Sequence, residues 1–71
     1  MEISKQERLE IINQKIKMIN ASIYDCSLDI RVAKNCSDEN MEKPSLTRMK
    51  KLEAMKDEYL KAKAEEEQAK D

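Results

Sequence analysis

The stretch from Asn35 to Leu46, NCSDENMEKPSL, decides how this chain folds, because it separates two long segments that each have helical periodicity. It holds the only proline, Pro44, one of the two cysteines, Cys36, and a run of polar residues. Short polar side chains bond to nearby backbone groups and therefore favour turns. The stretch either folds one helix back on another or kinks a single long helix.

Upstream of this stretch, one stripe of apolar residues repeats at alternating steps of three and four residues. The stripe consists of Leu9, Ile12, Ile16, Ile19, Ile23, Cys26, Ile30 and Ala33. This spacing is typical of a helix that packs one face against a partner helix. Ser4 followed by Glu7 has the pattern of a capping box at a helix start. We therefore expect a first helix over about residues 4–35.

A second stripe follows the proline and predicts a second helix. It comprises Leu52, Met55, Tyr59, Ala62, Glu66 and Ala69, with Leu46, Met49 and Leu60 beside it. Proline is tolerated in the first turn of a helix, where its missing N–H would have no partner. The sequence thus predicts a loop over about residues 36–44, a helix over about 45–66 and a frayed tail over 67–71.

The phase of the two stripes favours a turn over a kinked helix. If the first helix continued, its stripe would fall on the following five residues, none of which suits a core: Ser37, Asn40, Pro44, Thr47 and Lys51. We therefore expect a single all-α domain, an antiparallel two-helix coiled-coil hairpin. The expected partners are Ile30 with Leu52, Cys26 with Met55, Ile23 with Tyr59, Ile19 with Ala62, Ile16 with Glu66 and Ile12 with Ala69. The first turns of the first helix would then project past the end of the second.

The first helix also has apolar residues on the face opposite its stripe. These are Ile11, Met18, Ala21, Leu28 and Val32, which form the candidate partner or dimer surface. Isolated exposed apolar residues are ordinary, but four large ones on one face are more typical of a contact surface. A two-helix hairpin of 71 residues also buries little core. We expect a homodimer that forms a four-helix bundle, or docking on a partner protein.

Composition argues against several other classes of partner. Lys and Arg number 14 against 15 Asp and Glu, so no strong field of one sign attracts nucleic acid or an anionic membrane. The basic cluster RMKKLEAMK, Arg48–Lys56, is more consistent with a solvated helix face than with nucleic-acid binding. No segment has the roughly 20 apolar residues that cross a bilayer. Because glycine is absent, we also expect no tight turns that need positive φ.

The residues offer little for catalysis or for binding a metal or cofactor. The chain has no histidine, no paired nucleophile and base, and no glycine-rich phosphate loop. Asp25 and Asp29 lie one turn apart, yet a solvated face explains them more simply. The acidic run of Asp38, Glu39 and Glu42 lacks the glycine of an EF-hand. We therefore expect no enzyme, no metal and no cofactor.

The two cysteines are expected to be free thiols. Cys26 and Cys36 are ten residues apart on one predicted helix, which places their Cα atoms roughly 15 Å apart, too far for a disulfide. Cys26 belongs to the apolar stripe, whereas Cys36 lies near the helix end. Free thiols suit a reducing compartment, so we expect a cytoplasmic protein.

The runs IINQKIKMINASIYDCSLDIRVAKN and RMKKLEAMKDEYLKA, joined by a polar loop with DENMEKPS, resemble small two-helix proteins encoded by bacteriophages. The resemblance covers most of the chain. It implies an accessory protein that binds and inhibits or modulates a host protein, such as a defence component, in the host cytoplasm. The architecture is also similar to needle-subunit co-chaperones of type III secretion, which implies the alternative of an assembly chaperone or scaffold. Neither resemblance assigns a functional residue.

Overall fold

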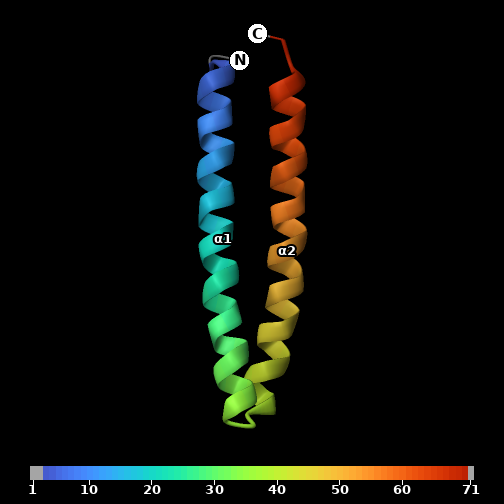
Figure 1. Ribbon diagram of the computed structural model, residues 1–71. Coiled ribbons are helices and arrows are strands. Elements are labelled where there is room, and N and C mark those ends of the chain that lie inside the picture. The colour runs from blue at the N-terminus through green and yellow to red at the C-terminus, as the bar shows by residue number, and fades with distance from the viewer. Residues whose placement is uncertain (1–2, 71) are drawn as a thin grey trace.

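The computed structural model describes residues 3–70 and confirms the all-α hairpin. Helix α1, Lys5–Asn35, and helix α2, Glu39–Gln68, run antiparallel and side by side along their whole length (Figure 1). The molecule measures 52 × 16 × 14 Å. It is therefore a rod that is only one helix pair thick, and each helix has a side that the other cannot cover.

The start of α1 follows the predicted capping pattern. The Ser4 hydroxyl oxygen accepts a hydrogen bond from the Glu7 backbone N–H at 3.2 Å, and the hydroxyl donates to the Glu7 carboxylate at 3.1 Å. These bonds satisfy a backbone donor that has no partner within the helix. The observed bounds of α1 agree with the predicted range of residues 4–35.

The connection between the helices is much shorter than the predicted loop of residues 36–44. It contains three residues, and Ser37 adopts a left-handed conformation with φ of 55°. The Asp38 N–H bonds to the Ala33 carbonyl at 2.8 Å, and the Ser37 N–H bonds to the Lys34 carbonyl at 3.2 Å. This pair of bonds is a Schellman motif, which ends α1 abruptly. The expectation that a chain without glycine avoids positive φ was wrong at Ser37.

Helix α2 begins at Glu39 and not near the predicted residue 45. The Asp38 carboxylate caps it by accepting a hydrogen bond from the Met41 N–H at 3.1 Å. The negative charges of Glu39 and Glu42 in the first turn interact favourably with the positive end of the helix dipole. Pro44 therefore lies inside α2, where it removes one helical hydrogen bond. The carbonyl left without a donor belongs to Asn40, which is exposed, so water can bond to it.

The short turn also changes the register between the helices. The Cys26 thiol bonds to the Ser45 carbonyl oxygen at 3.1 Å, and Arg48 forms an ion pair with Asp25 at 3.7 Å. The prediction placed Met55 opposite Cys26, but Ser45 occupies that position. All six predicted partner pairs share this error, because a loop of three residues in place of nine starts α2 earlier, so every residue of α2 lies farther from the turn than predicted.

Polar contacts close the other end of the hairpin. The Lys5 ammonium group donates to the carbonyl oxygens of Glu67 at 3.0 Å and Ala69 at 2.8 Å. Arg8 forms an ion pair with Glu66 at 2.6 Å. The first turns of α1 therefore do not project past α2. Of the predicted frayed tail, residues 67–69 are held at this end, and Asp71 lies outside the described residues.

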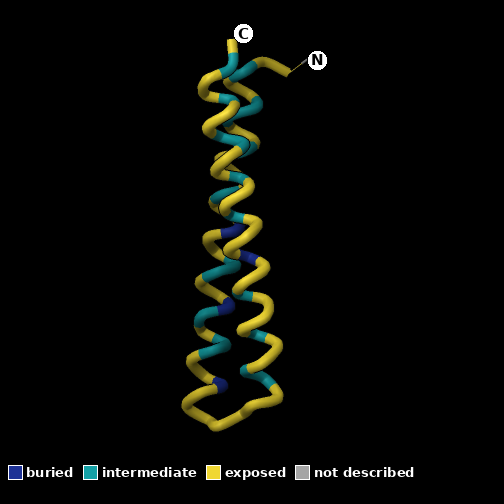
Figure 2. The backbone as a smooth tube through the Cα atoms, turned by 90° about the vertical axis from the view of Figure 1, so that its right-hand side faces the viewer, coloured by how far each residue is buried: buried dark blue, intermediate teal, exposed yellow. Residues whose placement is uncertain are grey.

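The core is a thin seam in the half of the rod nearer the turn (Figure 2). The buried side chains among the described residues are Ile19, Cys26, Ala33 and Leu52, with Ile23, Ile30, Met49 and Tyr59 packed partly against them. Met55, predicted for the inner stripe, is 40% exposed, and Lys56 is half-buried beside it. Lysine can occupy such a position because its aliphatic stem packs while its charge stays in water.

Candidate functional site

The outer face of α1 carries all five residues of the predicted partner surface. We define this face as Ile11, Met18, Ala21, Leu28 and Val32. Every member is exposed, and the four large side chains keep 50% (Ile11), 57% (Met18), 40% (Leu28) and 50% (Val32) of their surface in water. Helix α2 packs on the opposite side of α1, against Ile19 and Cys26. The hairpin therefore leaves the outer face of α1 uncovered.

The structure divides this face into two apolar parts. Ile11 and Met18 lie in the half of α1 near its start, while Leu28 and Val32 lie one turn apart near the loop. Ala21 stands between them and adds little bulk. The residues recur seven apart in two adjacent columns, since Ile11, Met18 and Val32 belong to one column and Ala21 and Leu28 to the next. This is the spacing of a second helix-packing seam.

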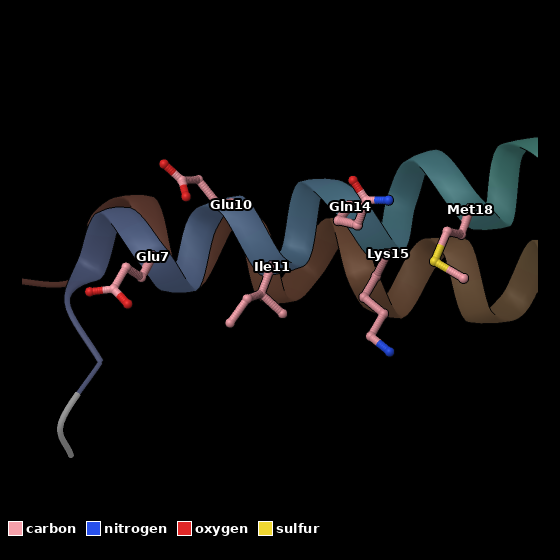
Figure 3. A pocket seen from close by; sticks show the side chains of 6 residues that line it. All are labelled: Glu7, Glu10, Ile11, Gln14, Lys15 and Met18. Atoms are coloured by element: carbon pink, nitrogen blue, oxygen red, sulfur yellow. The ribbon is translucent and has the colours of Figure 1, made fainter.

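A shallow groove of about 360 Å³ lies along the first part of the outer face. Ile11, Lys15 and Met18 project on one side of it, and α2 passes behind α1 (Figure 3). Glu7, Glu10 and Gln14 complete the lining. All six residues belong to α1, so the groove cannot enclose a small molecule as a ligand cavity does. Its form suits a ridge of side chains from another helix.

The polar neighbours of the outer face carry charges of both signs. Asp25 stands in the same column as Met18 and Val32, and its carboxylate forms the exposed ion pair with Arg48. Lys34 forms a longer ion pair with Glu42 at 3.9 Å. Arg48 from the basic cluster thus contacts a carboxylate of the same chain. Such exposed pairs contribute little to stability and remain accessible to other partners.

The acidic residues considered as cation ligands have structural roles here. Asp38 caps α2, and Glu39 and Glu42 lie in the first turn of that helix. Asp25 is paired with Arg48. Within residues 3–70, no group of three or more potential metal-ligating side chains is close enough to hold an ion.

Both cysteines are free thiols, as predicted. Cys26 is buried in the seam, where its thiol donates to the Ser45 carbonyl oxygen. Cys36 is exposed at the end of α1. No charged group within the described turn is bonded to Cys36.

A second hollow on α2 was missed by sequence reasoning. It is lined by Lys51, Ala54, Met55, Glu58 and Tyr59. The prediction assigned Met55 and Tyr59 to the inner stripe, so their exposed edges could not be anticipated. Tyr59 does pack partly against the core, whereas Met55 does not. The hollow is as shallow as the groove on α1, but it has fewer large exposed apolar side chains around it.

Comparison with known proteins leaves the site to be interpreted from its own geometry. No protein-family model matches the chain, and no curated protein or solved structure is significantly similar to it. Neither α1 nor α2, over the residues that the structure describes, is both long and apolar enough to span a membrane.

Proposed function

We propose that this chain is a non-enzymatic protein-binding module that uses the outer face of α1 to dock on a partner protein. In keeping with the resemblance to phage-encoded two-helix proteins, the partner is a bacterial host protein, which the module inhibits or modulates in the host cytoplasm. A component of host defence is the first candidate for that target.

The observation that carries this proposal is the exposure of large apolar side chains where α2 cannot reach them. Ile11, Met18 and Val32 each keep half or more of their surface in water. Exposed apolar area of large side chains gathered on one helix face is favourable to bury, and such area is typical of interaction surfaces. Burial of these side chains against a partner protein is therefore more favourable than their exposure to water.

The chemistry of the side chains supports binding in preference to catalysis. The sequence has no histidine, so it lacks the usual general base at neutral pH. Over the described residues 3–70, each of these two hollows is open and formed by a single helix, so neither shields a reaction from water. Flat helical surfaces of this type recognise other helices through ridges and grooves.

A pair of double variants tests the proposal. Met18→Glu with Leu28→Glu places two carboxylates in the outer face, where burial without a partner is costly. The control, Asn13→Glu with Asn20→Glu, adds the same charge at exposed positions of α1 outside that face. Both variants should stay helical, because glutamate is a good helix former and the inner seam is untouched.

The measurement is a quantitative pull-down from a bacterial host lysate, followed by a binding assay with the purified partner. We expect a protein that is enriched by the wild type and the control but lost with the outer-face variant. Equal enrichment by both variants would contradict the proposal. A partner that proves to be a subunit of a secretion or virion assembly would instead support the chaperone or scaffold alternative.

A further inference from the structure

We infer that a second copy of this chain covers the outer face of α1, with the two α1 helices antiparallel and centred between Ala21 and Ser22. The inference uses the surface of the proposed function but does not depend on the identity of any target. It rests on the order of charges along α1 and on the position of the apolar residues between them.

The charged residues on and beside the outer face change sign three times along α1. From the start of the helix they are the acidic Glu7 and Glu10, the basic Lys15 and Lys17, the acidic Asp25 and Asp29, and the basic Arg31. If two copies lie antiparallel, each acidic pair meets basic residues of the other copy. If they lie parallel and in register, like charges meet along the whole length, which is unfavourable.

Individual pairs follow from a two-fold axis between residues 21 and 22. Glu10 then lies opposite Arg31 of the second copy, and Lys15 lies opposite Asp29 of the second copy. For each pair, the midpoint between the two residue positions lies within about one residue, or 1.5 Å, of that axis. Within the described hairpin, none of these four side chains forms an ion pair with its own chain.

The aromatic residue on this side of the helix fits the same arrangement. Tyr24 is exposed, and the axis places Lys17 of the second copy opposite it. An ammonium group over a tyrosine ring is attracted by the ring face. One flank of the contact would therefore alternate Glu10–Arg31 pairs with Lys17–Tyr24 pairs, and the other would carry the Lys15–Asp29 pairs.

The apolar residues meet along the middle of the same contact. Ile11 faces Val32 of the second copy, and Met18 comes within one turn of Leu28 of the second copy. Ala21 lies beside the axis, where a small side chain lets two helices approach closely. The outer face of α1 is thus complementary to itself, as an isologous dimer requires.

The resulting dimer differs in shape from a compact four-helix bundle. The two α1 helices lie in the centre and the two α2 helices on the outside, in one layer. Because both copies bury the face that the proposed target would occupy, self-association and target binding exclude each other. The free protein would then be a dimer that separates when it binds its target.

The inference is tested with two double variants that keep the net charge at −1, since each exchanges one acidic and one basic residue. The first is Glu10→Lys with Lys15→Glu, and the second is Asp29→Lys with Arg31→Glu. In an antiparallel homodimer of either variant, all four designed pairs become like-charge contacts. We expect each variant alone to dimerise roughly 100-fold more weakly than the wild type, given the modest energy of each exposed pair.

An equimolar mixture of the two variants restores every pair, because each altered residue then meets an altered residue of opposite sign and each native residue meets its native partner. Sedimentation equilibrium should show the wild type and the mixture at twice the 8.3 kDa chain mass. Each double variant measured alone should sediment near 8.3 kDa. Circular dichroism should show equal helicity in all samples.

Three results would overturn the inference: a wild type that remains at 8.3 kDa up to about 1 mM, double variants that dimerise as strongly as the wild type, or a mixture that stays monomeric. These results are distinct from a failure of the proposed function. If the wild type is monomeric and its target binding is still lost in the Met18→Glu and Leu28→Glu variant, only the dimer is refuted. If the wild type is a dimer but binds no target, only the proposed function is refuted.

Discussion

The thiol of Cys26 lies 3.1 Å from the main-chain carbonyl oxygen of Ser45 and donates a hydrogen bond to it. Cys26 is fully buried, so at this contact the backbone of α2 lies directly against the seam of α1. A larger side chain would hold the helices apart here. The contact also sets the register, because it places the second turn of α2 beside the last third of α1.

Replacement of the buried thiol should cost more stability than replacement of the exposed one. We expect Cys26→Ala to lower the free energy of unfolding by about 1–2 kcal/mol, since it removes a hydrogen bond and leaves a small cavity. Cys36→Ala, the matched control, should change it by less than about 0.5 kcal/mol. Urea unfolding followed by circular dichroism measures both. Equal losses would show that Cys26 is not in the seam.

A glycine at the turn should stabilise the hairpin. Ser37 has φ of 55°, a region that costs roughly 1–2 kcal/mol for residues with a Cβ and nothing comparable for glycine. We expect Ser37→Gly to raise the free energy of unfolding by about 0.5–1 kcal/mol, after the greater freedom of glycine in the unfolded chain is subtracted. Ser37→Ala should give no such gain. A destabilised glycine variant would contradict the three-residue turn.

The open end of the hairpin should depend on Lys5. Its ammonium group bonds to two carbonyl oxygens at the end of α2, a helix whose own last turn has no basic residue. We expect Lys5→Gln to cost about 0.5–1 kcal/mol and to speed hydrogen exchange of the amides in the last turn of α2. Lys50→Gln serves as the control, because Lys50 is exposed and forms no ion pair within the described hairpin. Unchanged exchange in the Lys5 variant would argue against this contact.

The inner and outer sides of α1 should respond differently to the same truncation. Ile19 is 6% exposed, so Ile19→Ala should cost about 2–4 kcal/mol through lost burial and a cavity. Ile11→Ala should cost the monomer little, because Ile11 is half exposed. Chemical denaturation at one low protein concentration separates this effect from any dimer. Similar losses in both variants would mean that the two sides of α1 are wrongly assigned.

The fold class and the first helix could be predicted because they depend on a long, regular pattern. Eight apolar residues in strict three–four steps define α1, and Ser4 with Glu7 marks its start. The exposed position of the outer face followed from the same pattern, since residues opposite a packed stripe cannot reach the partner helix. These features required no knowledge of how the chain turns.

The turn and the register could not be predicted in the same way. The run Ser37–Asn40 is typical of a loop because its side chains bond to backbone, but Asp38 uses that capacity to cap α2. Pro44 indicates a helix start, although an exposed proline can lie inside a helix whose freed carbonyl is solvated. Nine loop residues in place of three then shifted every partner on α2. The pattern also predicts Met55 on the inner side of α2, where the structure has Lys56. A pattern based on hydrophobicity does not reveal that the aliphatic stem of a lysine packs against the partner helix.

Photo-cross-linking from the outer face of α1 tests the central claim most directly, namely that another protein surface covers this face. A benzophenone amino acid is placed at Leu28, on the outer face, and in a separate variant at Asn20, which is exposed on another side of α1. After irradiation of the purified protein and of host lysate, we predict covalent protein adducts from position 28 and few from position 20. Equal yields from both positions, or no adduct from position 28, would contradict the account.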